Sequence, residues 1–323
     1  MLLELAADRE VVLVGGKGGT GKTAVASALA LACARAGRPT LVVSTDPAHN
    51  LGHLWQRPIG DREVDLAARL RGLEIDPRRT TDAHIDAVRH TLQRLMPEHL
   101  SGEIRRHLEL AREAPGTHEA ALLERLAEVI ENRGPDELVV VDTAPSGHTA
   151  RLLALPELMQ AWTDGLLRSR HRSERFGAAL RGLGGVDTAG RQNPSADRRA
   201  RRDREIRAVL DRRRERFCRL RTTLQDARRT AFVIVLAAER VPVQESIELH
   251  DELLTSGLHV AGLVANKLSP ADAGPLLAAR HRQERPQLDQ LRARLPGLPV
   301  VEIPLLAGEV AGASGVGLLT PYL

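Results

Sequence analysis

Residues 15–23 read "GGKGGTGKT", a glycine-rich stretch that contains two lysines, Lys17 and Lys22. Residues 16–23 satisfy the pattern G-x-x-x-x-G-K-[ST] of a phosphate-binding loop, or P-loop, which needs only one lysine. The stretch lies between an apolar run that predicts a strand and a pattern that predicts a helix, which is the context that a P-loop requires. The sequence therefore predicts that a nucleotide phosphate binds here.

The chemistry of such a loop is electrostatic. Successive amides around its glycines form a nest for an anion, and the N-terminus of the following helix adds partial positive charge. We expect Lys22 to bridge the β- and γ-phosphates and the hydroxyl of Thr23 to bind Mg²⁺. The predicted nucleotide contacts in this loop are Gly16, Lys17, Gly18, Gly19, Thr20, Gly21, Lys22 and Thr23.

Outside the loop, short β-branched runs alternate with helical patterns, which indicates βαβ units on a parallel sheet. Strands are predicted at residues 10–15, 39–45, 137–143, 231–238, 260–266 and 299–304, and helices at 22–36, 243–256 and 271–294. Residues 61–134 and 156–229 are mostly helical in pattern and contain no convincing strand. Residues 184–199 are rich in Gly, Asn, Pro and Asp, which is typical of a mobile loop.

These patterns predict an α/β fold, with the doubly wound, mainly parallel sheet of a P-loop NTPase and an inserted α-helical subdomain. The nucleotide-binding core would comprise residues 1–60, 135–155 and 230–323. The helical subdomain would comprise residues 61–134 and 156–229, which are the two segments without predicted strands.

Two of the predicted strands end beside carboxylates. Asp142 ends the strand at 137–143, where it could support Mg²⁺, usually through water, although aspartate also caps helices at such positions. Asp46 follows the strand at 39–45 and could hold a water in line with the γ-phosphate, because phosphoryl transfer depends mainly on positioning. We expect His49 and His148, in the adjoining loops, to make hydrogen bonds rather than to bind a metal.

The composition limits the class of protein and the types of site. The chain has 323 residues, 42% of them hydrophobic, and lacks both a membrane-spanning apolar run and a signal-peptide pattern, so a cytoplasmic location is expected. Cys33 and Cys218 form no C-x-x-C pair, which disfavours structural zinc. Only three of the 46 basic residues are lysines, and two of these lie in the glycine loop, where a slim cation is needed.

The arginine-rich run at residues 198–229 has two interpretations. One is a surface for nucleic acid or for an anionic membrane. The other is a solvated helix face, because apolar side chains recur near helical spacing at Ile206, Leu210, Phe217, Leu220 and Leu224. Aromatic residues make up only 2% of the chain, so stacking platforms are scarce and nucleic-acid binding is disfavoured.

Taken together, these stretches resemble the ArsA/Get family of arsenite-pump ATPases and of ATPases that guide tail-anchored membrane proteins. The resemblance spans the chain and rests on "GGKGGTGKT", "STDPAHNLGHLW" (44–55), "LEIDP" (73–77), "DTAPSGHTARLL" (142–153), "AAE" (237–239), "ANKL" (265–268) and "PLLAGEVAG" (304–312). It implies an ATP hydrolase that uses ATP and Mg²⁺.

The resemblance also implies roles for single residues. Lys17 matches the lysine that reaches across a dimer interface to the partner's nucleotide, and Asp46 matches the aspartate that orients the attacking water. A homodimer with active sites completed in trans is therefore expected. The remaining matches are nucleotide contacts, namely Glu239, Asn266, Lys267, Pro304 and Leu305. Among these, the resemblance implies that Asn266 contacts the adenine and that the loop at Pro304–Leu305 closes over the base.

The chain departs from the family pattern in its cysteines and methionines. Eukaryotic tail-anchored-protein ATPases hold zinc between subunits with a C-x-x-C pair, which is absent here, so no zinc is expected and a bacterial member is favoured. Arsenite and antimonite are disfavoured as ligands, because soft metalloids prefer thiolates and only Cys218 lies in the helical region. Only Met96 and Met159 lie in the helical segments, so a client groove would be lined by leucines from 155–167 and 206–224, unless these residues simply pack the subdomain.

The leading hypothesis is an ATP-driven homodimer whose opening and closing handles a partner, such as a hydrophobic membrane-protein segment or a membrane receptor. The switch loops at 44–55 and 142–150 would sense the γ-phosphate. Two alternatives stay open. One is an ATPase subunit that couples hydrolysis to anion or metalloid export, and the other is a partitioning-type nucleotide switch that acts on DNA or membrane.

Overall fold

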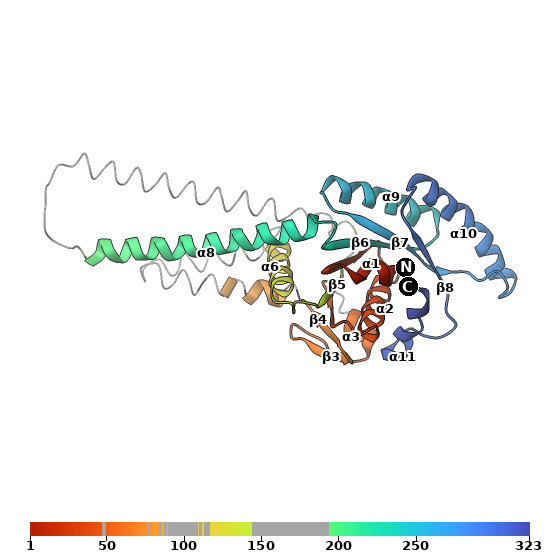
Figure 1. The fold of residues 1–323 in the computed structure, drawn as a ribbon, viewed down its shortest axis with the longest axis horizontal. Helices are drawn as coiled ribbons and strands as arrows, with labels where there is room; N and C mark the ends of the chain where they lie inside the picture. The colour runs from red at the N-terminus through yellow and green to blue at the C-terminus, as the bar shows by residue number, and fades with distance from the viewer. Residues whose placement is uncertain are drawn as a thin grey trace.

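The computed structural model describes residues 1–46, 50–76, 78–83, 85–86, 89, 109, 112, 117–143 and 194–323. An eight-stranded sheet forms its centre, with the strand order β3-β4-β2-β5-β1-β6-β7-β8 (Figure 1). The strands are β1 (Val11–Gly15), β2 (Thr40–Ser44), β3 (Val64–Ala67), β4 (Leu70–Glu74), β5 (Leu138–Asp142), β6 (Thr230–Leu236), β7 (Val260–Leu268) and β8 (Val300–Pro304). Only the pairing of β3 with β4 is antiparallel among the described strands.

Helices cover both faces of this sheet (Figure 1). They are α1 (Leu2–Ala7), α2 (Lys22–Arg35), α3 (Asn50–Trp55), α6 (Thr117–Glu131), α8 (Pro194–Gln225), α9 (Arg240–Thr255), α10 (Pro275–Arg294), α11 (Gly312–Gly317) and the 3-10 turn η2 (Thr320–Tyr322). The predicted α/β fold with a mainly parallel sheet is confirmed, and all six predicted strands and three predicted helices form. Within the described part of the chain, no helix has the length and apolar character needed to cross a bilayer.

Successive side chains of β1 point to opposite faces of the sheet, and a buried core covers each face. Val11 and Leu13 belong to a core shared with α6, α8, α9 and α10. Val12 and Val14 belong to a second core, shared with α1, α2, α3 and α11. Because both faces of the sheet are covered, every position of such a strand is buried and must be apolar.

The expectation of no strand within residues 61–134 is wrong, because β3 and β4 lie there and extend the sheet beyond β2. Their short sequences "VDLA" and "LRGLE" have little local strand preference. Tertiary contacts stabilise these two strands instead. Strand β4 pairs along its length with β2. Leu66 packs closely over Gly72, where an added Cβ would lie 2.6 Å from a Leu66 methyl group. The β3–β4 turn also places Arg69 at a positive φ of 60°.

The predicted loop at residues 184–199 is wrong in its last part. Helix α8 begins at Pro194 and continues through residue 199. Proline is favoured in the first turn of a helix because the amide it lacks has no partner there. Residues 184–193 lie outside the described residues.

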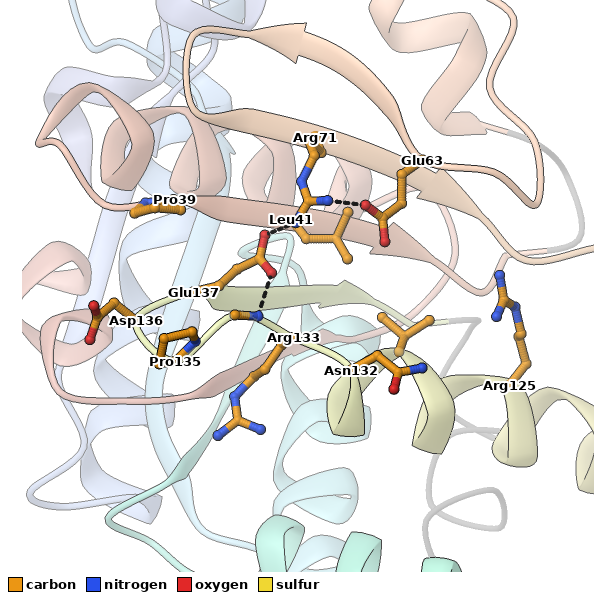
Figure 2. Close-up of a pocket in the computed structure, with 12 residues that line it drawn as sticks. Pro39, Leu41, Glu63, Arg71, Arg125, Asn132, Arg133, Pro135, Asp136 and Glu137 are labelled. Carbon is orange, nitrogen blue, oxygen red and sulfur yellow. Dashed lines mark hydrogen bonds and ion pairs between the residues drawn. The ribbon is translucent and has the colours of Figure 1, made fainter.

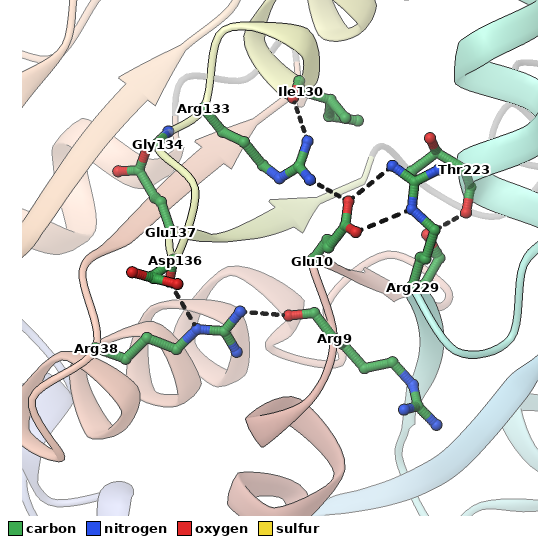
Figure 3. Close-up of polar contacts among 11 residues, drawn as sticks. Arg9, Glu10, Arg38, Ile130, Arg133, Gly134, Asp136, Glu137, Thr223 and Arg229 are labelled. Atoms are coloured by element: carbon green, nitrogen blue, oxygen red, sulfur yellow. Dashed lines mark hydrogen bonds and ion pairs between the residues drawn. The ribbon is translucent and has the colours of Figure 1, made fainter.

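A carboxylate clamp joins α6 and α8 to the amino edge of the sheet. Figure 3 shows Glu10, just before β1, between the guanidinium groups of Arg133 and Arg229, which follow α6 and α8. Arg229 donates from Nε and from a terminal nitrogen to Glu10, each at 2.9 Å, and Arg133 pairs with the same carboxylate. The hydrogen bond from Arg229 is the main cause that holds the pKa of Glu10 below its usual value. Further along, Arg216 and Arg219 of α8 pair with acidic side chains of α6.

A cavity of about 320 Å3 lies at the same amino edge, beside the starts of β2 and β5 (Figure 2). Charged side chains line it, and its arginines are already paired with acidic side chains. Arg71 bridges Glu63 and the buried Glu137, while Arg125 pairs with Asp61. Because these charges are compensated internally, the cavity lacks the free positive charge that a phosphate site needs.

Candidate nucleotide site

The candidate site lies at the carboxyl edge of the sheet, where the ends of β1, β5 and β2 meet. Strand β1 is the point at which the chain changes direction across the sheet, with β5 on one side and β6 on the other. Open α/β sheets bind ligands in the crevice at this position. The predicted P-loop connects Gly15, the last residue of β1, to Lys22, the first residue of α2.

The ends of the P-loop are locked in place, and its middle is open. Gly16 has a φ of 140°, and a Cβ there would lie 2.1 Å from the carbonyl oxygen of Val235 on β6. Gly21 has a φ of 87°, and a Cβ there would lie 2.5 Å from the side-chain nitrogen of Asn266 on β7. A Cβ on Gly18 or Gly19 would meet nothing within 4 Å, so these residues border open space where a phosphate can approach.

Lys22 is buried, with 6% of its surface exposed, and its ammonium group donates to the carbonyl oxygen of Lys17 at 3.1 Å. The hydroxyl of Thr20 donates to the same carbonyl at 2.9 Å. Burial lowers the pKa of Lys22, while the nearby carboxylates of Asp142 and Asp46 raise it. A phosphate that entered the loop would replace the carbonyl as the partner of this cation and relieve its burial cost.

Thr23 and Asp142, which the sequence predicts as the Mg²⁺ site, are in direct contact. The Thr23 hydroxyl donates to Oδ2 of Asp142 at 2.7 Å, and the Ser44 hydroxyl donates to the same oxygen at 3.3 Å. The other carboxyl oxygen, Oδ1, is buried without a hydrogen-bond partner among the residues that the structure describes. Burial is the main cause that raises the pKa of Asp142 to about 7. These groups fit Mg²⁺, which prefers oxygen ligands and few protein carboxylates. A bound cation would also supply the positive charge that stabilises the ionised form of the buried Asp142 carboxyl.

Asp46 lies two residues beyond β2 and is tied to this cluster through Ser44. Its backbone amide donates to the Ser44 hydroxyl at 3.3 Å, and the Asn50 side chain donates to its Oδ2 at 3.1 Å. The buried Glu74 then accepts hydrogen bonds from the amides of Leu51 and Gly52 at the start of α3. The position of Asp46 is therefore fixed on both sides by side chains of the same chain.

Lys17, the second lysine of the loop, pairs within its own chain. Its Nζ lies 3.0 Å from Oε1 of Glu245 on α9, and both side chains remain partly exposed. The two lysines of the loop therefore point to different partners. Lys22 is buried against the loop itself, while Lys17 lies at the surface, where solvent weakens its ion pair with Glu245.

Comparison with known proteins decides the family. The model of the ArsA ATPase family, described as anion-transporting ATPase, matches residues 9–322. The chain belongs to the ArsA ATPase family. It is therefore an ATP-hydrolysing enzyme, which confirms the resemblance inferred from the motifs.

Several eukaryotic ATPases are similar to this ArsA-family chain over most of their length. ATPase ASNA1 homolog 1 of Paramecium tetraurelia is 29% identical, over 94% of this chain and 89% of the relative. ATPase GET3 of Podospora anserina is 30% identical, over 93% and 86%. ATPase GET3B of Arabidopsis thaliana is 30% identical, over 96% of this chain and 78% of the relative.

Two further predicted residues of this ArsA-family ATPase contact the P-loop directly. Asn266 is buried, and its side-chain nitrogen donates to the carbonyl oxygen of Thr20 at 2.8 Å. Lys267 follows at a positive φ of 60° and donates from Nζ to the carbonyl oxygen of Gly19 at 3.1 Å. All three lysines of the chain therefore touch the P-loop or belong to it.

The other predicted residues lie farther along the same edge. Pro304 ends β8 beside Leu268, and the amide of Leu305 donates to the carbonyl oxygen of Leu268 at 2.8 Å. Glu239, just before α9, pairs with Arg280 of α10 at 3.0 Å. The predicted roles of His49, His148 and the switch segment 144–150 lie outside the described residues.

Sequence reasoning assigned no role to four side chains that the structure places around the site: Ser44, Glu74, Glu245 and Glu284. Ser44 and Glu74 lie within stretches that carry the family resemblance, yet the motif itself does not say which groups they bind. Glu245 and Glu284 lie on α9 and α10, more than two hundred residues from the P-loop. A contact of this kind has no local sequence signal, because only the fold brings the two segments together.

Proposed function

We propose that this ATPase is a cytoplasmic, Mg²⁺-dependent homodimer in which each active site is completed by Lys17 of the partner subunit. The observation that carries the magnesium site is the buried Asp142 carboxyl, with one oxygen on Thr23 and the other without a partner in the described part of the chain. Support for the role in trans comes from Lys17 itself, whose side chain is 43% exposed and forms a surface ion pair that solvent weakens.

In this account, the P-loop amides and Lys22 bind the phosphates, and Thr23 with Asp142 holds the cation. Mg²⁺ neutralises charge on the β- and γ-phosphates. Asp46 orients the attacking water, a role for which a weakly basic carboxylate is sufficient when its position is fixed. Asn50 and Ser44 fix that position through the hydrogen bonds described above.

ATP would draw the two subunits together, and hydrolysis would release them. We propose that this switching handles a hydrophobic membrane-protein segment or a membrane receptor, as the family resemblance implies. The moving part would be a helical subdomain formed by the chain from the end of β4 to residue 134 and by residues 156–229, with the remainder as the core. In support of this division, α6 and α8 are joined to each other by ion pairs.

The cysteines give no support to a metalloid site. Cys33 is buried on α2, and burial raises the pKa of its thiol to about 11. Cys218 lies on α8, in a different layer of the structure. Because metalloids bind thiolates rather than neutral thiols, metalloid-stimulated hydrolysis is not proposed.

The proposal is tested with Asp46→Asn, which removes the carboxylate but leaves the P-loop intact. This variant is expected to bind ATP with wild-type affinity, to lose turnover by roughly a hundredfold or more, and to accumulate as a dimer at saturating ATP and Mg²⁺. Light scattering with ATP, with ADP and without nucleotide measures the mass. A monomer at saturating ATP would overturn the homodimer, and retained turnover would remove Asp46 from its role.

The client is tested with the same trapped variant. A synthetic apolar segment of about 20 residues, long enough to span a bilayer, serves as the probe. It is expected to co-elute with the ATP-bound dimer and to be released with ADP. Equal capture in both nucleotide states would contradict nucleotide-driven handling of such a segment.

A further inference from the structure

A buried carboxylate on α10 lies next to the nucleotide site but touches none of the residues to which a role has been assigned. Glu284 is 5% exposed, although an ionised side chain is costly to bury without partners. Its Oε2 accepts a hydrogen bond from the amide of Ser269 at 2.8 Å, and its Oε1 accepts one from the Ser269 hydroxyl at 2.8 Å. Both oxygens therefore bind a single residue, just beyond the end of β7.

A second side chain of α10 holds the same residue. His281 donates from Nδ1 to the carbonyl oxygen of Ser269 at 2.8 Å. The amide, hydroxyl and carbonyl of Ser269 are thus all bound by α10. Anchoring of the helix does not require this arrangement, because Leu288 and Leu291 already bury its apolar side. The geometry indicates that α10 fixes Ser269, rather than the reverse.

The segment that precedes Ser269 is strained. The pairing of β7 with β8 shifts register between Ala265 and Leu268, which marks a bulge. Within that bulge, Lys267 adopts a positive φ of 60°, a left-handed conformation that is unfavourable for a residue with a side chain. Such a conformation persists only where neighbouring contacts impose it. The hydrogen bonds from α10 act two residues away.

This bulge is the part of β7 that contacts the P-loop. Asn266 and Lys267 bind the carbonyl oxygens of Thr20 and Gly19, as described above. The fit is close, because a Cβ on Gly21 would lie 2.5 Å from the side-chain nitrogen of Asn266. A small shift of the bulge would therefore change how the amides of the loop are presented to a phosphate.

We propose that Glu284 is a positioning residue of the nucleotide site: by fixing the bulge at the end of β7, it sets where Asn266 and Lys267 hold the P-loop. The inference rests on the nucleotide site proposed above. It adds a connection from α10 to the loop through Ser269. Arg280 extends that connection, since it lies 3.7 Å from Glu284 and pairs with Glu239 before α9.

The test is Glu284→Gln, which keeps the size of the side chain but removes its charge: its oxygen can still accept from the Ser269 amide, while its amide group can contact the Ser269 hydroxyl only if that hydroxyl turns to accept. The P-loop would then bind ATP more weakly in the ground state and in the transition state, by the same factor in both. KM and Kd for ATP are therefore expected to rise about tenfold, while kcat stays within about twofold of the wild-type value. Asp289→Asn, an exposed carboxylate on the same helix, is the matched control and should leave both constants unchanged. A wild-type Kd in Glu284→Gln would overturn the proposal.

A combined variant separates positioning from general destabilisation. If Glu284 acts through Asn266 and Lys267, then adding Glu284→Gln to a chain that carries both Asn266→Ala and Lys267→Ala should weaken ATP binding by no more than about twofold. Losses that multiply would overturn the proposal. If Glu284→Gln does not fold, Ser269→Ala decides instead: it loses only the hydroxyl bond and should raise Kd by a smaller factor, and no change would count against the inference.

Lys22→Ala distinguishes this inference from the nucleotide site on which it rests. Loss of ATP binding in Lys22→Ala with a normal Glu284→Gln would reject the role of Glu284 alone. Retained binding in Lys22→Ala would reject the P-loop site itself, and with it the role of Glu284. Loss in both variants, with the control intact, is the expected result.

Discussion

The three lysines have distinct tasks around one loop. Lys22 is buried against the loop's own carbonyl, Lys267 supports the loop from β7, and Lys17 lies at the surface on Glu245. An arginine in these positions would place a wide planar group where a single compact cation makes one contact. The scarcity of lysine elsewhere in the chain is consistent with this requirement.

At the residue scale, the magnesium site leads to a prediction for Asp142→Asn. The variant keeps the shape of the side chain but removes its charge, so the Mg²⁺ concentration for half-maximal ATPase activity should rise by roughly 10–100-fold. Activity titrated against free Mg²⁺ at saturating ATP measures the change. Asp272→Asn, on the loop before α10, is the control, and an unchanged Mg²⁺ requirement in Asp142→Asn would contradict the assignment.

The same carboxyl gives a pH dependence. Because the pKa of Asp142 lies at about 7 before a cation binds, protons compete with Mg²⁺ below that value. The apparent Mg²⁺ affinity of the wild-type protein should therefore fall as the pH is lowered through about 7 and level off above about 8. Comparison with Asp142→Asn isolates this contribution from titration of the nucleotide, and an identical pH dependence in both proteins would contradict it.

How much the sequence reveals differs between residues of the site. The connection of a strand to a helix by the glycine loop, and the place of Asp142 at the end of a neighbouring strand, were predictable because short stretches of sequence encode them. The partners of these groups were not. Three acidic side chains bind segments that are distant in sequence. Glu74 binds the start of α3, Glu245 pairs with Lys17, and Glu284 binds Ser269, just after the bulge of β7.

At the scale of elements, six strands were predictable, including β8 at one edge of the sheet, and the pair β3 and β4 at the other side was not. Strands β1, β5 and β6 are buried on both faces, so their sequences are apolar except at strand ends such as Asp142 and Thr230. Strands β3 and β4 lie at one side of the sheet and form through pairing with β2, which local sequence does not encode. The start of α8 was missed because Asn, Pro and Asp are favoured both in loops and at helix N-termini.

The Glu10 clamp leads to a prediction about α6 and α8. The pKa of Glu10 is lower in the folded protein than in the unfolded chain. The ionised carboxylate therefore stabilises the fold at pH values above the pKa of the unfolded chain, and this contribution is lost as the pH falls through the pKa of the folded protein. Glu10→Gln should therefore lower the free energy of unfolding by about 1–3 kcal/mol at neutral pH. The difference from wild type should shrink as the pH is lowered from about 7 to below about 4.5.

Urea unfolding at several pH values, followed by far-UV circular dichroism, measures this difference. Glu4→Gln is the matched control, since Glu4 lies six residues earlier with a fully solvated carboxylate that is 88% exposed. A Glu10→Gln effect that stays constant across the pH range would show that the clamp does not act through the charge of Glu10.

At the scale of the whole molecule, the sheet separates two regions with different tasks. The nucleotide site occupies the carboxyl edge, while α6 and α8 are clamped at the amino edge by Glu10 and by ion pairs between them (Figures 1 and 3). We therefore expect α6 and α8 to move together when the nucleotide state changes. The dimer proposed here would place Lys17 of each subunit on the nucleotide of the other.

The central claim is tested most directly by mixing two inactive variants, Lys17→Ala and Asp46→Asn. If Lys17 acts in trans, the mixed dimer contains one intact site, formed by the Lys17→Ala subunit's own Asp46 and by Lys17 of the partner subunit. In an equal mixture that is combined before ATP is added, random pairing makes half of the dimers mixed, and each mixed dimer has one of its two sites intact. The mixture should then recover about a quarter of the wild-type ATPase rate. If Lys17 acts only within its own chain, both sites of the mixed dimer stay defective, and a mixture as inactive as either variant alone would contradict the account.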